Sequence, residues 1–216
     1  MASATDICNM ALSHVGADTA VTSISPPDGS VEAGHCARFY AIARAEMLED
    51  HTWTWSKARA TLAETTNAST IWAYAYALPS DCLSPVRVLQ QSILFDFLTQ
   101  PFPTLVTADE LEQWTERGSA DFEVEGQVLY THEPDAVLLY TRDITDTTKF
   151  SMKSVVALSY LLASYLAGPI IKGEPGATAA AKFRQAYDLK KGQAAAGDAN
   201  GSSERAEHVP DFIRAR

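Results

Sequence analysis

Cysteine is scarce in this chain. Only three occur among the 216 residues, an odd number at wide spacing. A secreted disulfide framework normally uses an even set. Cys8 and Cys36 each fall on the apolar stripe of a helix-like segment, which predicts buried core thiols. With no basic and apolar leader pattern at the start of the sequence, we expect a protein kept in a reducing cytoplasm.

Positive charge is also scarce. Lysine and arginine number 17 against 27 acidic residues, which gives a net charge of -10 and an isoelectric point near 4.9. A protein that grips DNA through its surface needs the opposite balance. The balance remains compatible with a protein that DNA merely passes.

Long apolar runs are missing as well. The best candidate, residues 155–171, contains two serines, a glycine and a proline, so no run is expected to span a bilayer, which takes roughly 20 residues. We therefore expect a soluble protein without a membrane partner. The length suits one domain with a subdomain, and 46% hydrophobic with 20% charged residues is ordinary globular composition.

Motifs that carry chemistry are nearly absent. The five histidines are dispersed without metal-ligand spacing, at positions 14, 35, 51, 132 and 208. The glycines of residues 168–176 lack the Lys-Ser or Lys-Thr of a phosphate-binding loop and follow a helix, so they predict an interhelical turn. We expect no cofactor, no metal and no catalytic residue.

Two enzymatic alternatives stay open. Cys82 would become a nucleophile if His132 lay within hydrogen-bond reach as a base, and nothing in the sequence places the two together. The carboxylates of Asp109, Glu110 and Glu112 lie in a polar segment and are expected to be surface charge unless they are buried.

Period-two patterns predict strands in the middle of the chain. Trp53 and Trp55 alternate, and a second run alternates up to Pro79, so two aromatic strands are expected. Because no lysine or arginine lies near the second run, core packing or a subunit interface is favoured over stacking on nucleic acid. The residues expected in the core are Trp53, Trp55, Trp72, Tyr76, Leu78, Pro79, Tyr140 and Phe150.

Residues 122–141 predict further strands with turns at Gly126 and at 133–135. One face of these strands is expected to hold Phe122, Val124, Val128, Tyr130, Val137, Leu139 and Thr141. Between the two strand regions, residues 92–97 suggest a strand, Pro101 and Pro103 a loop, and residues 108–117 a short helix with Trp114.

Helical spacing predicts four helices, at about residues 5–15, 30–49, 151–166 and 176–196. Ser3, Thr5 or Asp6 can cap the first, and Gly16 ends it. The last is expected to bury Ala180, Phe183 and Tyr187. The fold class is therefore α+β, a helical bundle from the two ends of the chain with an inserted β-rich subdomain. Residues 1–50 and 147–196 form the bundle, and residues 51–146 form the subdomain.

Residues 197–216 form an expected extended tail. Their small and polar composition is typical of unstructured chain until a short apolar cluster near the end. That cluster is flanked by arginines and is predicted to dock on a partner. The residues concerned are Val209, Phe212, Ile213, Arg214 and Arg216.

Four segments, in order, resemble a known family. They are ICNMALSHVG, GHCARFYAIARAEMLEDHTWTW, YAYALPSDCLSPVRVL and residues 122–170. The strongest elements are Trp53 with Trp55, residues 78–83, and the hairpin that ends in Tyr140, Arg142 and Asp146 before Phe150. Over residues 5–171 the chain resembles the tail tubular protein A family, the head-to-tail adaptors of short-tailed bacteriophages. Residues 89–118 and those after 192 carry no part of the resemblance.

The resemblance implies a non-enzymatic ring of twelve subunits between the portal of the capsid and the tail nozzle. It implies a place in the virion tail or neck, after assembly from subunits in the host cytoplasm. DNA passes through the ring without specific binding. Another phage neck or tail-completion protein of similar architecture is the nearest alternative, and a small cytoplasmic enzyme is a distant one.

A closed ring needs an interface between two different faces of the subunit. An obligate contact buries about 2,000 Å² or more, and the helix at residues 151–166 and the strand aromatics are expected to supply it. Twelve copies carry about -120 charges, and a lumen of like charge repels phosphate. The alternative is that the acidic residues only keep the free subunit soluble.

Overall fold

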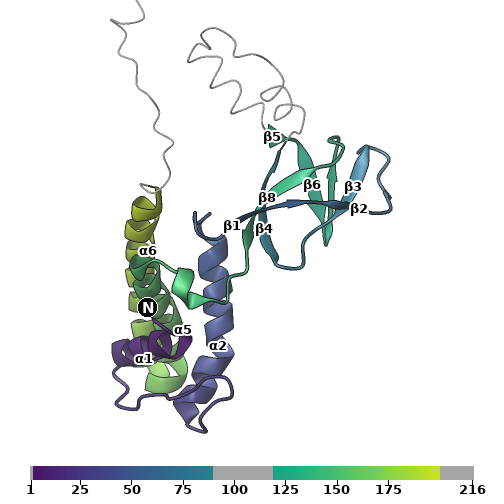
Figure 1. Cartoon of the computed structure of the whole chain (residues 1–216). Coiled ribbons are helices and arrows are strands. Elements are labelled where there is room, and N and C mark those ends of the chain that lie inside the picture. Colours follow the sequence, from purple (N-terminus) through teal and green to yellow (C-terminus); the bar gives the residue numbers. More distant parts are fainter. Residues whose placement is uncertain (1, 90–118, 200–216) are drawn as a thin grey trace, which may run out of the picture.

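The computed structural model describes residues 2–89 and 119–199 and has an α+β fold (Figure 1). A helical bundle is built from both ends of the described chain, and a β-rich module is inserted between them. The helices are α1 (Ala4–Val15), α2 (Val31–Glu49), the 3-10 turn η1 (Thr147–Lys149), α5 (Met152–Ile171) and α6 (Gly173–Ala199). The strands are β1 (Lys57–Thr61), β2 (Ala63–Glu64), β3 (Tyr74–Ala77), β4 (Cys82–Leu89), β5 (Ser119–Ala120), β6 (Phe122–Glu125), β7 (Val128–Thr131) and β8 (Val137–Arg142).

Local signals set the helix ends. Ser3 and Asp6 form a reciprocal capping box at the start of α1, and Gly16 ends that helix with a positive φ of 81°. Ser30 and Ser151 cap α2 and α5 through their hydroxyls. The predicted first and second helices are confirmed.

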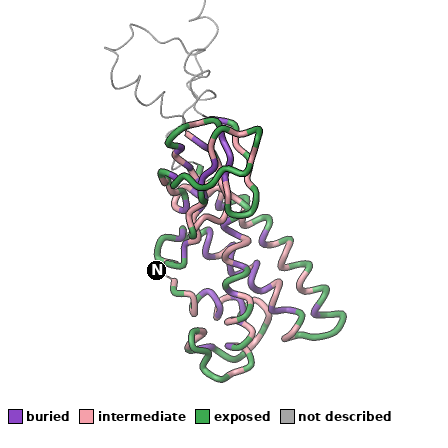
Figure 2. The backbone as a smooth tube through the Cα atoms, turned by 90° about the vertical axis from the view of Figure 1, so that its right-hand side faces the viewer, coloured by how far each residue is buried: buried purple, intermediate pink, exposed green. Residues whose placement is uncertain are grey.

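Helix α5 is the centre of the bundle and packs against α1, α2 and α6. Leu158, Leu161, Leu162 and Leu166 are fully buried there (Figure 2). Met47 on α2 and Tyr187 on α6 complete the same cluster.

The expectation that no run reaches membrane-spanning length is wrong. Helix α5 runs unbroken for 20 residues, and by length and composition alone it is apolar enough to cross a bilayer. The core helix of a soluble protein passes the same test. Of the apolar window, 56% is buried inside the folded chain, so the bundle core explains its apolar character.

The turn between the last two helices is shorter than predicted. Helix α5 continues through Pro169, and the reversal occurs at Lys172 and Gly173, which have positive φ of 61° and 62°. A proline inside a helix lacks the backbone donor and crowds the carbonyl one turn earlier. It lies here in the last turn, after the buried Leu166 and Ala167, and α5 ends two residues beyond it. The predicted start of the last helix at residue 176 is therefore three residues late.

Gly176 lets α5 and α6 approach closely. A Cβ atom at this position would lie 3.0 Å from the backbone oxygen of Ala167. We expect Gly176→Val to lower the free energy of unfolding by about 1–3 kcal/mol, because the neighbour is backbone and cannot rotate away. Gly192→Val on the same helix, where a Cβ meets nothing within 4 Å, should change it by less than about 0.5 kcal/mol. Urea unfolding followed by circular dichroism measures both, and equal losses would contradict the close approach.

The β module consists of two four-stranded antiparallel sheets. The strand orders are β1-β8-β4-β5 and β2-β3-β7-β6. Tyr76, Leu129, Leu138 and Tyr140 form their shared core. The hairpin of β6 and β7 turns at Gly126, as predicted, with a φ of 61°.

The predicted core face of β8 is wrong by one residue. Leu138 and Tyr140 are buried, whereas Val137 and Leu139 are only partly buried. The prediction therefore fails for Val137 and Leu139, but it holds for Thr141, which is buried together with its neighbour Tyr140. In β7 the three residues from Leu129 to Thr131 are all buried, so both faces of that strand are covered. Phe122 and Val124 in β6 are the less exposed residues of that strand, as expected.

Trp53 and Trp55 do not form a strand, which corrects the prediction of two aromatic strands. They lie in the turn that leaves α2, and their rings stack at 5.7 Å between centroids. Trp53 is fully buried, and its indole nitrogen donates a hydrogen bond to the Met47 carbonyl oxygen at 2.9 Å. Both indoles belong to the bundle core, and neither lies in the core of the β module.

Several predictions from the sequence fall outside the described residues. These are the strand at 92–97, the loop with Pro101 and Pro103, the helix at 108–117 with Trp114, the carboxylates Asp109, Glu110 and Glu112, and the partner-binding residues Val209, Phe212, Ile213, Arg214 and Arg216.

Candidate assembly surfaces

Large apolar side chains are exposed on two separate faces of the bundle. Val31 and Ile42 on α2 are 71% and 52% exposed, and Leu189 on α6 is 62% exposed. Each face lies opposite the residues that its helix buries, and α5 packs between the two helices (Figure 1). Single exposed apolar residues are common on protein surfaces. Whether one of them belongs to an interaction surface therefore depends on the residues exposed around it.

The outer face of α2, which we call the α2 face, is poor in charge. Besides Val31 and Ile42, its exposed residues are Gly34 and Ala41, and its two ions are Arg38 in the middle and Glu49 at the C-terminal end. At 1.5 Å per residue the 19-residue helix is about 28 Å long. Four of the six exposed residues of this helix are small or apolar.

The outer face of α6, which we call the α6 face, has a similar character. Around Leu189 the exposed residues at helical spacing are small or uncharged, with Lys182 and Asp188 as ions: Thr178, Ala181, Gln185, Gly192, Gln193 and Ala196. The 27-residue helix is about 40 Å long. The α6 face is therefore longer than the α2 face and equally smooth.

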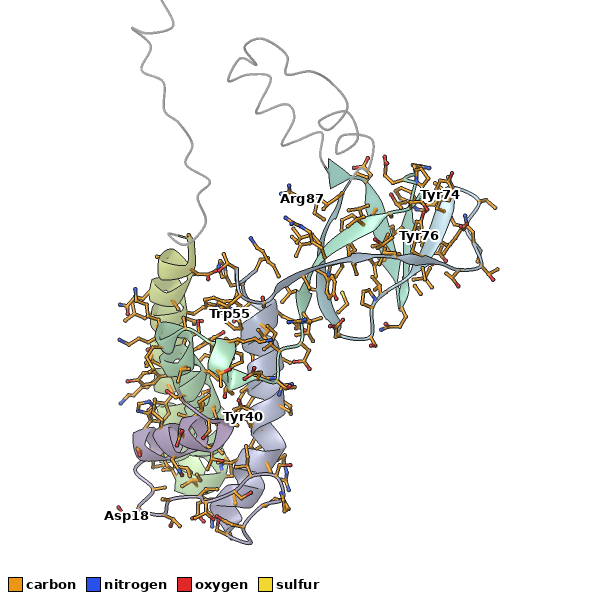
Figure 3. All side chains as sticks on the ribbon, viewed as in Figure 1. Asp18, Tyr40, Trp55, Tyr74, Tyr76 and Arg87 are labelled. Atoms are coloured by element: carbon orange, nitrogen blue, oxygen red, sulfur yellow. The ribbon has the colours of Figure 1, made fainter. Side chains whose placement is uncertain are left out.

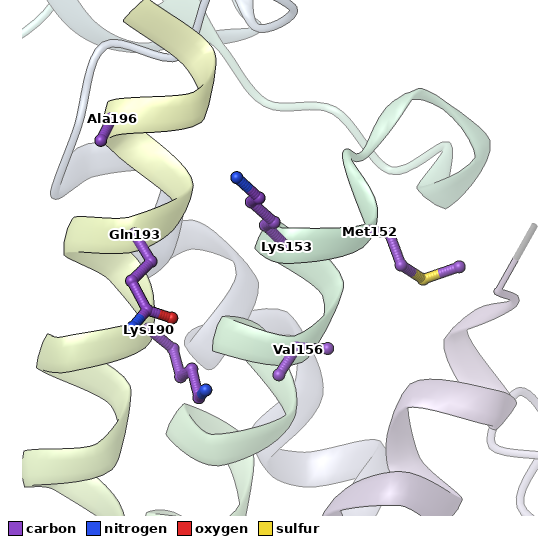
Figure 4. Close-up of a pocket in the computed structure, with 6 residues that line it drawn as sticks. All are labelled: Met152, Lys153, Val156, Lys190, Gln193 and Ala196. Carbon is purple, nitrogen blue, oxygen red and sulfur yellow. The ribbon is translucent and has the colours of Figure 1, made fainter.

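A groove of about 490 Å³ borders the α6 face. It lies between the first turns of α5 and the last turns of α6, and Met152 at its edge is 65% exposed (Figure 4). Its lining is Met152, Lys153, Val156, Lys190, Gln193 and Ala196.

A polar clamp holds α6 against α2. The Tyr187 hydroxyl donates to Asp50 at 2.6 Å, and Lys191 pairs with the same carboxylate at 2.9 Å. One turn away, Arg184 pairs with Glu46 at 2.6 Å, and Tyr165 also donates to Glu46. Two tyrosines and two cations thus satisfy two acids near the end of α2.

The clamp determines the charge state of Asp50. Burial alone would raise the pKa of this carboxyl, but the hydrogen bonds from Tyr187 and Lys191 outweigh burial and lower the pKa. A carboxylate at the C-terminal end of a helix is disfavoured by the helix dipole, so Lys191 also offsets that repulsion. In return, burial and the bond to Asp50 raise the pKa of Tyr187.

Asp50→Asn is expected to destabilise the protein in a pH-dependent way. The folded pKa lies below the unfolded value, so the carboxylate stabilises the fold above about pH 4 and loses that effect as pH falls through the folded pKa. We expect a loss of about 1–2 kcal/mol at pH 7 that shrinks towards pH 3. Urea unfolding at the two pH values measures it.

Asp188→Asn is the matched control, since its side chain is 58% exposed and lies 3.7 Å from the same Lys191. That variant should stay within about 0.5 kcal/mol of the parent. An Asp50→Asn deficit of the same size at pH 3 and pH 7 would contradict the assignment.

The β module is fastened to the bundle at two places. Arg44 on α2 forms a bidentate ion pair with Asp143 just after β8, with contacts of 2.9 and 3.0 Å. Asp198 near the end of α6 accepts hydrogen bonds from the backbone nitrogen and the hydroxyl of Thr54, at 2.7 and 2.5 Å. The helix consequently continues to Ala199, past the predicted start of the tail at residue 197.

The proposed thiol site does not assemble. Cys82 lies on β4, where burial, with a smaller effect of Asp81, raises its thiol pKa. His132 follows β7 in the other sheet, stacks on Trp72 at 4.8 Å and accepts a hydrogen bond from the Ala73 backbone nitrogen. No hydrogen bond between Cys82 and His132 is present among the described residues. A raised thiol pKa is the opposite of what a nucleophilic cysteine needs.

The core candidates from the sequence fall into three groups. Trp53, Tyr76, Tyr140 and Phe150 are buried. Trp55 and Leu78 are partly buried and pack against the bundle core and the β core, respectively. Trp72 and Pro79 are also only partly buried, and the Trp72 indole donates to Glu123 at the edge of the second sheet (Figure 3 labels the neighbouring Tyr74 and Tyr76).

The helix at residues 151–166 is expected to supply part of a subunit interface, and within the single chain most of its apolar residues are already buried. Its leucines pack in the core of the chain itself, and its exposed residues lie in its first turn and its last turn. Sequence reasoning missed the α2 and α6 faces. The signal was present, because Ile42 and Leu189 are large apolar residues at helical positions off the buried stripe.

Within the described residues, no group of three or more histidine, cysteine, aspartate or glutamate side chains has the arrangement to hold a metal ion. In comparisons with known proteins, neither a protein-family model nor a curated protein sequence matches this chain.

Proposed function

We propose that this chain is a structural virion protein, the head-to-tail adaptor of a short-tailed bacteriophage. Twelve copies form a ring that joins the portal to the tail nozzle and lines part of the DNA ejection channel. The ring is not an enzyme. It uses no cofactor and no membrane, and DNA passes through it without specific binding.

The observation that carries the proposal is the pair of unlike, charge-poor faces on one subunit. A closed ring of identical subunits needs two different complementary surfaces, because each copy meets one neighbour on either side. The α2 face and the α6 face supply such a pair on the two flanks of one bundle. An enzyme active site has no need of either.

The architecture gives a second line of support. A helical bundle from both ends of the chain with an inserted β module is the fold that the family resemblance implies. The module projects from the end of α2 and leaves both helix faces uncovered (Figure 1). In the proposed ring the bundles form the wall, and the net charge of -10 per subunit keeps phosphate from adhering.

The partner-binding part of the proposal is tested by removing residues 204–216. The deletion should leave the chain folded with an unchanged circular dichroism spectrum, because the described core lies within residues 2–199. It should abolish binding to the portal ring of the same virus in a sedimentation assay. Portal binding at parental strength after the deletion would sink this role for the segment.

A further inference from the structure

We propose that residues 200–216 of this chain dock in the groove between α5 and α6 of the same subunit, with Val209, Phe212 and Ile213 against Met152 and Val156. The docking itself stands without the adaptor function. Docking would also cover the edge of the α6 face before assembly. This consequence rests on the proposed adaptor function.

The first argument is continuity. Ala196 lines the groove, and α6 ends three residues later at Ala199, so the described chain ends close to the groove. Asp198 is tied to Thr54, which fixes this exit point relative to the bundle. The segment is therefore delivered to the groove at high effective concentration.

The second argument is reach. From Lys190 to Ala196 the groove extends along about two turns of α6, or about 9 Å. Residues 200–208 span about 30 Å when extended, at 3.3–3.6 Å per residue. Nine residues thus suffice to reverse direction and bring Val209 back to any point of the lining.

The third argument is chemical complementarity. Met152 and Val156 give the groove an apolar floor, and Lys153 and Lys190 stand on its two sides. Neither lysine has an ion pair with a carboxylate among the described residues. The segment offers apolar residues at three- and four-residue spacing, with Asp211 between them and Glu204 and Glu207 before them. The same segment carries Arg205, Arg214 and Arg216, so its net charge is zero. The match therefore rests on Glu204, Glu207 and Asp211 facing the two lysines and on the apolar residues facing Met152 and Val156.

The geometry at Gly197 brings the second lysine to the same place. A Cβ atom there would lie 3.0 Å from the Lys153 ammonium, so this cation already rests against the last turn of α6. An acidic side chain just beyond the end of α6 would therefore be close to the positive charge of Lys153. The cation near the helix end also offsets the negative end of the helix dipole.

Disulfide trapping tests the docking in the full-length chain. Val156→Cys is combined with Phe212→Cys in a Cys82→Ser background, since the other two cysteines are buried. Under mild oxidation we expect an intramolecular cross-link that forms at least tenfold faster than in a control pair of Ile42→Cys with Phe212→Cys. Ile42 is exposed on the other flank of the bundle, so the control measures free diffusion of the segment.

Equal cross-linking rates in the two pairs would overturn the proposal. A cross-linked dimer in place of the intramolecular product would also overturn it, because the occupant would then be the segment of a second copy. As a non-covalent check, acylation of Lys153 and Lys190 should be slower in the full chain than in one ending at residue 199. Unchanged acylation would speak against docking.

The outcome is separable from that of the adaptor proposal. If rings form on the portal but the cross-link does not form, only the docking fails. If the cross-link forms and no ring appears with any portal, only the adaptor function fails.

Discussion

Replacing Trp53 by alanine is expected to lower the free energy of unfolding by about 3–5 kcal/mol, the range for losing a large buried aromatic side chain. The side chain is fully buried, stacks on Trp55 and donates to the Met47 carbonyl oxygen. Its removal leaves a cavity where α2 passes into the β module and orphans a buried acceptor. Typical domain stabilities are about 5–15 kcal/mol, so a substantial fraction of the stability would be lost.

Chemical denaturation followed by circular dichroism measures this effect. Trp72→Ala is the control, because that ring is only partly buried and lies at the edge of the second sheet. It should cost about 1 kcal/mol. A Trp53→Ala cost no greater than that of Trp72→Ala would show that the indole does not hold the junction together.

Ile42→Asp and Leu189→Asp are each expected to abolish ring assembly while leaving the subunit folded. Both side chains are more than half exposed in the single chain, so a carboxylate there costs the fold little. In the ring each would be buried against a neighbour, where an unpaired charge costs about 3–5 kcal/mol per interface. Repeated around a closed ring, that cost prevents assembly. Light scattering on the portal-bound fraction measures it.

Ile71→Asp is the matched control for both variants. Ile71 is 77% exposed, but it lies in the loop before β3, away from both helix faces. The Ile71→Asp variant should form rings to the same extent as the parent protein. Loss of rings in all three variants would mean that apolar exposure in general, and not these two faces, drives assembly.

Mixing the two helix variants sharpens the test. Ile42→Asp keeps an intact α6 face, and Leu189→Asp keeps an intact α2 face. If the two faces bind each other, the mixture forms pairs that stop at two subunits, since each pair has one competent interface and two blocked ends. Rings of parental mass in the mixture would exclude this pairing of faces.

The helices were predictable because their signals are local. Ser3, Ser30 and Gly16 mark the ends of α1 and α2 by side-chain hydrogen bonds and backbone conformation within one turn. The backbone conformation at Trp53 and Trp55 was not predictable from the sequence, because two aromatic residues at alternating positions occur in turns as well as in strands. Trp53 and Trp55 gain more by packing on Phe150 and Met47 in the bundle than they would on a sheet face.

Register and assembly surfaces depend on partners distant in sequence. The core face of β8 is fixed by its neighbours β1 and β4, whose pairing the alternation alone does not specify. The burial of α5 follows from α6 folding back across Gly176, which the proline at 169 obscured. The α2 and α6 faces became visible only when the buried side of each helix was known.

The measurement that most directly tests the central claim is the mass of the purified chain, alone and mixed with the portal ring of the same virus. Light scattering gives the mass, and negative-stain images give the stacking. The account predicts subunits that stay small alone and become a ring of twelve stacked on the portal. A chain that stays monomeric with no portal affinity would contradict it and direct the search to another neck or tail-completion role.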